Sequence, residues 1–185
     1  MSDCSQISDG GCCLILSSER GLSRISAQQK NNLVEIISYG HTTGPLGQVK
    51  DFSELDVTNV AANQAYTSSG WQPKDIHIAE VHDCFSITEA LIYEALGFCK
   101  KGEGVSFCVS GATLHGGSLP VNAGGGLLAC GHPVGATGVR QALEIFRQMN
   151  GFCGEYQITP HPTRGIAVNI GGDDRTSIVT LYRKK

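Results

Sequence analysis

The stretch from residue 75 to residue 95, "DIHIAEVHDCFSITEALIYEA", changes its hydrophobic period partway along. Within residues 75–81, Ile76 and Ile78 alternate with their neighbours in the period of two that is typical of a β-strand. Ser86 and Glu89 then match the S-x-x-E capping box that opens a helix. Apolar residues recur behind it at helical spacing, at Ile87, Leu91 and Ala95. The stretch therefore predicts a strand, a junction at residues 82–85 and a helix, and ligands of α/β sheets usually bind at such junctions.

Strand-like and helix-like segments alternate on both sides of this stretch. We expect further strands at residues 8–18, 33–40, 165–170 and 176–184. We expect helices from residue 56 to Gly70 and over residues 139–149, a helix or connection over 19–32, and a loop at 42–48. The last two strands form a hairpin around a turn at residues 171–174. This order predicts an α/β layered sheet with parallel pairing in the middle and antiparallel pairing at the end.

A glycine-rich stretch, "GGGLLACGHPVGATG", occupies residues 124–138. Gly126 and Gly131 have the spacing of a phosphate-binding loop, but His132 and Pro133 stand where that loop needs Lys and then Ser or Thr. A dinucleotide-binding fingerprint also fails, because no apolar strand precedes the glycines. The glycines are therefore interpreted as letting the backbone crowd around one imidazole.

Composition limits the classes of function. The 185 residues are 41% hydrophobic and 17% charged, which is typical of one globular domain, or slightly more than one. The net charge of −3 favours neither nucleic acid nor an anionic membrane surface as a partner. The longest apolar run near the start, residues 12–16, is too short for a membrane span.

The eight cysteines contain no C-x-x-C pair, so no structural zinc site is expected. The spacing of the remaining histidines indicates no metal site either. We expect free thiols in a reducing compartment.

With residues 82–85 (His-Asp-Cys-Phe) and 131–133 (Gly-His-Pro) placed, the sequence resembles the C-terminal half of a thiolase over nearly its whole length. Most thiolases carry Asn-Glu-Ala-Phe at the first motif, and the His-Asp-Cys-Phe version resembles the sterol-carrier-protein type. The resemblance implies a thiolase-like layered fold, with a mixed five-stranded sheet and helices on both faces. It divides the chain into residues 1–32, a remnant of the N-terminal half, and 33–185, the C-terminal domain.

Two departures from the family pattern affect the expected function. Most thiolases carry Cys-x-Gly in the terminal hairpin, with the cysteine as acid/base, whereas this chain has Asn169, Ile170 and Gly171. The resemblance implies that Cys84 takes over that role. The nucleophilic cysteine of a thiolase lies in its N-terminal half, so we expect this chain alone to lack activity.

The resemblance implies cleavage of a 3-oxoacyl-CoA by a second CoA, or the reverse Claisen condensation. His132 is expected to take the nucleophile's proton or to donate to a thioester oxygen, and a helix beginning near Gly135 disfavours its protonation. Cys84 precedes the N-terminus of a helix, a location that lowers the pKa of a thiol.

The sequence allows two interpretations of His82 and of Asp83, and the roles of Gly171 and Ser5 depend on the family pattern alone. His82 either orients a water of the oxyanion hole or donates to the oxyanion directly, or it is a histidine with a structural role at a strand end. Asp83 either sets the tautomer of a histidine or caps the helix that follows. The resemblance implies an oxyanion contact through the backbone N–H of Gly171 and a contact of Ser5 with the pantetheine arm of CoA.

No cofactor is expected, because the substrates are coenzyme A thioesters themselves. The expected partners are acyl-CoA, CoA and further copies of the chain in a homodimer or larger assembly. Family resemblance favours a peroxisome-like organelle or a mitochondrion. The rival interpretation is a non-catalytic, thiolase-like protein that binds acyl-CoA or lipid, and a ketoacyl-synthase-like condensing enzyme is a third.

Overall fold

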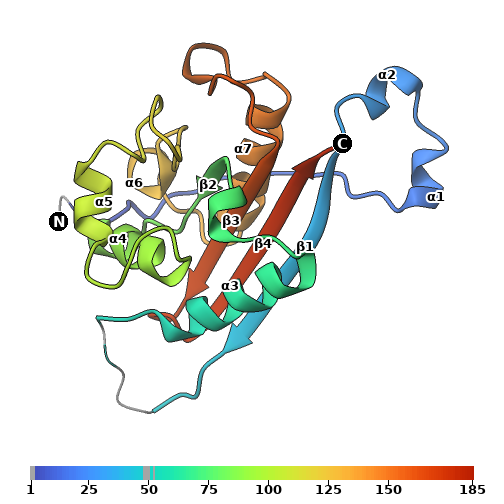
Figure 1. The fold of residues 1–185 in the computed structure, drawn as a ribbon. Coiled ribbons are helices and arrows are strands. Elements are labelled where there is room, and N and C mark those ends of the chain that lie inside the picture. The colour runs from blue at the N-terminus through green and yellow to red at the C-terminus, as the bar shows by residue number, and fades with distance from the viewer. Residues whose placement is uncertain (1–2, 48–50, 52) are drawn as a thin grey trace.

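The computed structural model describes residues 3–47, 51 and 53–185. The order of its helices and strands along the chain can be followed in Figure 1. They are α1 (Glu19–Leu22), α2 (Ala27–Lys30), β1 (Val34–Thr43), α3 (Asp56–Ser69), β2 (Ile78–Glu80), α4 (Ser86–Ala95), α5 (Gly104–Val109), α6 (Gly126–Cys130), α7 (Thr137–Met149), β3 (Arg164–Gly171) and β4 (Thr176–Lys184), with 3-10 turns at Pro73–Asp75 and Gly154–Tyr156. The predicted α/β class is confirmed.

The described strands form one mixed sheet in the order β1-β4-β3-β2. β2 and β3 pair in parallel, whereas β3–β4 and β4–β1 are antiparallel, as the order of elements predicts. The predicted count of five strands is wrong, because the described residues form four. At the β2 edge, Val121 makes only an isolated parallel bridge to Ala79. The preceding Pro120 has no N–H to donate, and Asn122 has a left-handed φ of 48°, so the pairing stops there.

The predicted strand at residues 8–18 is also wrong. These residues have extended or irregular backbone without a strand, and Ile15 and Leu16 are 94% and 75% exposed. An apolar run forms a strand only when a neighbouring strand satisfies its backbone, and no sheet partner lies beside this run in the described structure. The segment crosses from α4 and α6 to α1 and α2 at the opposite side of the molecule (Figure 1).

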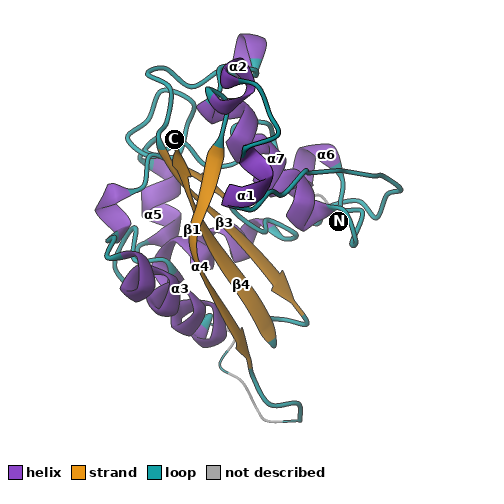
Figure 2. Cartoon of the chain, turned by 90° about the vertical axis from the view of Figure 1, so that its right-hand side faces the viewer, coloured by secondary structure: helices purple, strands orange, loops and turns teal. Residues whose placement is uncertain are grey.

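The core lies on both faces of the sheet (Figure 2). On one face, α3 and α4 pack against alternate residues of β3 and β4, including Ile166, Val168 and Leu181. On the other face, α7 places Ile145 and Met149 against the remaining strand positions. The alternation of a strand thus supplies apolar contacts to both layers, and this holds β2, α4 and α7 in one rigid unit.

Helix α4 begins without the predicted capping box. Its N-cap is Phe85, and no side chain caps it. Ser86 is already the first helical residue, and Glu89 accepts a hydrogen bond from the Tyr93 hydroxyl instead. The helix itself and its order after β2 are as predicted.

Candidate functional site

The loops that carry the two motifs meet at one pocket of about 560 Å³. His82 and Cys84 come from the junction after β2, His132 from the loop between α6 and α7, and Gly171 from the end of β3. Four of the six candidate residues named from the sequence therefore line one pocket, together with Asn169.

The N-terminal segment holds the two motif loops beside each other. The backbone N–H of Ser5 donates to the Cys84 carbonyl at 2.9 Å, and the N–H of Ser86 donates to the Asp3 carbonyl at 3.1 Å. On the other side of the segment, the N–H of His132 donates to the Gln6 carbonyl at 2.8 Å. Ser5 itself is buried behind Cys84, outside the described lining of the pocket, and its contact with pantetheine stays a prediction.

His82 and His132 are in direct contact. Their ring centroids are 4.8 Å apart and the rings are nearly perpendicular, at 89°. His82 is 4% exposed, and its Nδ1 has no hydrogen-bond partner among the described residues. Burial, assisted by the neighbouring His132, lowers the pKa of His82 to about 4. The imidazole of His82 is consequently neutral at physiological pH.

The other side of the His132 ring faces the first residue of α7. Nδ1 of His132 lies 2.7 Å from Oγ1 of Thr137, which is 1% exposed. The helix begins at Thr137, two residues later than Gly135. Thr137 is a site residue that the sequence analysis missed, because its contact depends on how the loop folds back over the helix start.

Asp83 fastens the glycine-rich loop to the first motif. Its carboxylate accepts from the backbone N–H groups of Leu127 at 2.7 Å and Leu128 at 3.2 Å, at the start of α6. The predicted capping of the helix that follows Asp83 is therefore wrong, since the helix that it caps comes 43 residues later. Gly126 allows this approach, because it has a φ of 64° and a Cβ there would lie 2.2 Å from the carboxylate.

Cys84 lines the pocket as a partly buried thiol. Burial raises its pKa and outweighs the hydrogen bonds with Thr88 and Phe85, which lower it. The predicted lowering by the helix N-terminus is therefore wrong in direction. A raised pKa keeps this thiol protonated at neutral pH.

Asn169, which stands where most thiolases have cysteine, is held by a chain of amides. Its Nδ2 donates to Oε1 of Gln141 at 2.9 Å, and Nε2 of Gln141 donates to the Val168 carbonyl at 3.0 Å. Gln141 is fully buried in α7. The amide group of Asn169 is thereby fixed at the pocket wall.

Part of the pocket lining forms an apolar wall. Its side chains are Leu55, Phe85, Ile87, Leu91 and Ile178. Ile87 and Leu91 are one helical turn apart on α4 and face the pocket, whereas Ile92 and Tyr93 of the same helix enter the core. Helical spacing in the sequence identified α4 but not which apolar positions face the pocket.

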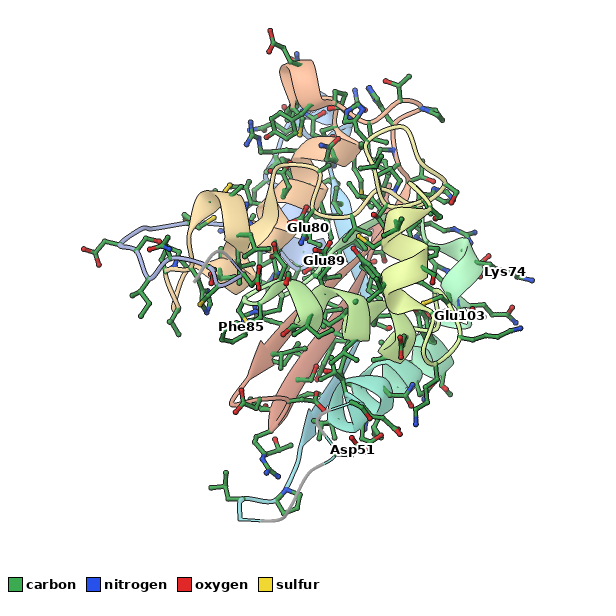
Figure 3. All side chains as sticks on the ribbon, turned by 90° about the vertical axis from the view of Figure 1, so that its left-hand side faces the viewer. Asp51, Lys74, Glu80, Phe85, Glu89 and Glu103 are labelled. Carbon is green, nitrogen blue, oxygen red and sulfur yellow. The ribbon has the colours of Figure 1, made fainter. Side chains whose placement is uncertain are left out.

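A buried carboxyl group, Glu80, lies directly before the first motif, and Figure 3 shows it in the interior near Glu89. Neither of its carboxyl oxygens has a hydrogen-bond partner among the described residues. Burial raises the pKa of Glu80 well above its usual value, the nearby Glu144 raises it further, and Arg140 opposes both effects. Glu80 escaped the sequence analysis because a lone carboxyl group inside a strand matches no motif, although alternation places it on the same face as Ile76 and Ile78.

Three further observations concern the part of the chain that the structure describes. No helix there is long and apolar enough to cross a membrane. No three or more His, Cys, Asp or Glu side chains there are grouped so as to hold a metal ion. The eight cysteines all lie in this part, and all are free.

Both the fold and the paired motif loops are those of a thiolase, and comparison with known proteins confirms the class. The chain belongs to the thiolase C-terminal domain-like family, whose model matches residues 38–184.

Individual relatives lie in the same class. The chain is 35% identical over 176 residues to the benzoylsuccinyl-CoA thiolase subunit BbsB of Thauera aromatica, covering 95% of this chain and 45% of the relative. It is 37% identical to the acetyl-CoA acetyltransferase of Methanothermobacter thermautotrophicus, covering 98% and 47%. It is 36% identical to sterol carrier protein 2 of Rattus norvegicus, covering 97% and 33%. The chain thus spans less than half the length of each of these relatives.

A solved structure shares the fold. The structure described as the Ltp2-ChsH2(DUF35) aldolase matches with a TM-score of 0.70 and 25% sequence identity, covering 82% of this chain and 40% of that chain.

Proposed function

We propose that this chain supplies the acid/base and oxyanion-binding part of an acyl-CoA thiolase site. The observation that carries the proposal is the meeting of His82, Cys84 and His132 at one pocket, with the backbone of Gly171 at its edge. These groups match the needs of carbon–carbon bond cleavage next to a thioester: a base, a proton donor and donors for a developing oxyanion.

The reaction places a separate demand on each residue. His132 takes the proton of the attacking thiol, which the family pattern assigns to the N-terminal half of the enzyme. That thiol attacks C3 of the 3-oxoacyl-CoA, the C2–C3 bond breaks, and its electron pair becomes the enolate of acetyl-CoA. Cys84 then gives its S–H proton to C2, and the neutral His82 and the Gly171 N–H stabilise the oxyanions.

The raised pKa of Cys84 supports the proton-donor role. In the cleavage direction the group must arrive protonated, and burial keeps the thiol protonated at neutral pH. Asn169 cannot exchange a proton in this way, and its amide is fixed by Gln141. Of the cysteines, which all lie in the described part of the chain, Cys84 is the one that lines the pocket.

The apolar wall supports an acyl-CoA substrate with an apolar acyl group. From Ser86, the first residue of α4, to Leu91 the helix rises about 7–8 Å at 1.5 Å per residue. Lengthening the acyl group along this wall should therefore strengthen binding until it passes Leu91. The assembly we propose is a homodimer or larger, which is in keeping with one relative being named a subunit.

Thiolysis of acetoacetyl-CoA tests the proposal. The 185-residue chain alone should show no turnover, whereas a chain extended upstream with a thiolase N-terminal half should be active. In the extended protein, Cys84→Ala should lower the rate about 10²–10⁴-fold, as expected for loss of a general acid. The matched control is Cys130→Ala, since Cys130 is exposed and outside the pocket lining of the described structure. Unchanged turnover by Cys84→Ala would refute the assignment.

A non-catalytic acyl-CoA or lipid-binding protein is the second candidate function. The replacement of the family's acid/base cysteine by Asn169 favours it, and so do relatives named sterol carrier protein 2 and non-specific lipid-transfer protein-like 2. Acyl-CoA binding that depends on Leu91, combined with no turnover by the extended protein, would support this alternative.

A further inference from the structure

We propose that Thr137 is a positioning residue that holds His132 in the tautomer with hydrogen on Nδ1, which leaves the lone pair on Nε2. The catalytic consequence rests on the proposed function, whereas the tautomer itself does not. The inference comes from the contacts of one buried hydroxyl group.

The Thr137 hydroxyl has two neighbours that can share only one hydrogen. Oγ1 lies 2.7 Å from Nδ1 of His132 and 3.1 Å from the carbonyl oxygen of Pro133. The carbonyl oxygen is always an acceptor, and a threonine hydroxyl in a helix commonly donates to the carbonyl four residues earlier. The same carbonyl also accepts from the backbone N–H groups of Ala136 and Thr137, so it anchors the first turn of α7.

If the hydroxyl hydrogen goes to Pro133, the short contact with His132 needs its hydrogen from Nδ1. The opposite arrangement would point the hydroxyl at Nδ1 and leave two oxygen lone pairs facing each other at 3.1 Å. The first arrangement satisfies both contacts, and the second satisfies one. Thr137 is 1% exposed, so water does not compensate for a lost hydrogen bond there.

The tautomer decides what His132 does in the reaction. With Nδ1 turned to α7, Nε2 lies on the opposite side of the ring, away from the helix. A lone pair on Nε2 can accept the S–H proton of an attacking thiol, and the sulfur electron pair then forms the bond to the acyl carbon. Nδ1–H stays with Thr137 throughout, so the resulting imidazolium keeps its hydrogen bond.

The contact between the two histidines separates their roles. His82 meets the His132 ring edge-on at 4.8 Å, and burial lowers the pKa of His82 to about 4. A group with so low a pKa is a poor base at neutral pH. The base is therefore His132, and His82 is left as a neutral donor.

The chain contains a matched control with the opposite expected tautomer. Nδ1 of His77 lies 3.3 Å from the backbone N of Thr163 and 3.2 Å from its Oγ1. A backbone N–H can only donate, so Nδ1 of His77 must accept, and its hydrogen is on Nε2. One histidine–threonine pair thus predicts hydrogen on Nδ1, and the other predicts hydrogen on Nε2.

Nitrogen NMR of the ¹⁵N-histidine-labelled chain tests the proposal at a pH where both rings are neutral, without any need for activity. The shifts of His132 should show a protonated Nδ1 and an unprotonated Nε2, and those of His77 the reverse. Thr137→Val should shift His132 towards the other tautomer, whereas Thr137→Ser, which keeps the hydroxyl, should resemble the unchanged chain. Hydrogen on Nε2 of His132 in the unchanged chain would overturn the proposal, even if Thr137→Val fails to fold.

Kinetics of the extended enzyme separate this proposal from the proposed function. Thr137→Val should slow acylation of the upstream cysteine about tenfold, the effect of one lost hydrogen bond on the tautomer population, and Thr137→Ser should restore it. The NMR result with an inactive extended enzyme would refute the thiolase function alone. An active enzyme whose His132 has hydrogen on Nε2 would refute the positioning role alone.

Discussion

Replacing Asp83 by alanine should release the glycine-rich loop from the first motif. The carboxylate accepts from the N–H groups of Leu127 and Leu128 at 2.7 and 3.2 Å, and Leu127 is fully buried. A buried donor left without an acceptor costs about 1–3 kcal/mol. Leu128 is partly exposed, so water can satisfy its N–H at a smaller cost. Alanine also removes a carboxylate whose burial opposes ionisation, which offsets part of this cost, so we expect a net loss of about 1–3 kcal/mol in the free energy of unfolding.

Urea unfolding at pH 7 and 25 °C measures this loss, with hydrogen exchange as a local readout. The amides of Leu127 and Leu128 should lose protection in Asp83→Ala. Asp83→Asn keeps one acceptor oxygen for these N–H groups and should therefore lose less stability than Asp83→Ala.

The contribution of Asp83 to the free energy of unfolding should change with pH in one direction. Burial is the largest influence on Asp83 and raises its pKa. A carboxyl group with a raised folded-state pKa stabilises the fold below its ordinary pKa, and this stabilisation is lost as the pH rises through the folded pKa. The advantage of the unchanged chain over Asp83→Asn should therefore shrink as the pH rises from about 4, the ordinary pKa of aspartate. An alanine variant within about 0.5 kcal/mol of the unchanged chain, with both amides still protected, would refute the reasoning, because harmless surface changes have effects of that size.

Three other predictions follow from packing and charge. Gly40→Ala places a Cβ 1.9 Å from the Ala61 carbonyl oxygen and should lower the free energy of unfolding by about 1–3 kcal/mol. Gly116→Ala is the control, because its Cβ meets no described atom within 4 Å and should change the free energy of unfolding little. Equal effects of the two variants in urea unfolding would contradict this prediction. Burial raises the pKa of Glu80, so the stabilising effect of the Glu80 carboxyl group is lost as the pH rises above about 4.5. The stability of Glu80→Gln relative to the unchanged chain should therefore increase between pH 5 and pH 8. A stability difference that stays constant over this range would contradict the prediction. Burial also predicts the alkylation profile of Cys84: its reaction with iodoacetamide, followed by peptide mass spectrometry, should reach half its maximal rate at a higher pH than that of free glutathione. Parallel profiles would exclude a raised pKa.

The sequence was sufficient to predict the elements whose hydrophobic period is set by the sheet. β1, β2, the terminal hairpin and the helices α3, α4 and α7 lie where alternation and helical spacing predict them. The failures involve partners distant in sequence. Residues 8–18 are apolar enough for a strand but have no strand beside them in the described structure. The S-x-x-E pattern at Ser86 has no capping role, because the N-terminal segment occupies that end of α4 and the Asp3 carbonyl accepts the N–H of Ser86.

The candidate site likewise has features that the sequence predicts and features that it does not. Motif resemblance predicted the residues that meet at the pocket, because each motif lies at the end of an element that the sheet positions. It did not predict their surroundings. The pKa of Cys84 depends on how deeply the junction is buried, and the target of Asp83 lies on a helix 43 residues later. Both properties come from tertiary packing, which no local pattern contains.

The reacting end of the pocket is built from groups that burial keeps uncharged. His82 has a pKa of about 4 and is neutral, and the raised pKa of Cys84 keeps its thiol protonated. Glu80, behind the first motif, is likewise displaced towards its neutral form. In the proposed reaction a negative charge then develops on the enolate oxygen beside these uncharged groups. Fixed donors act most strongly on such a charge, because a desolvated site screens it little. This gives a physical reason for burying His82 in contact with the partly exposed His132.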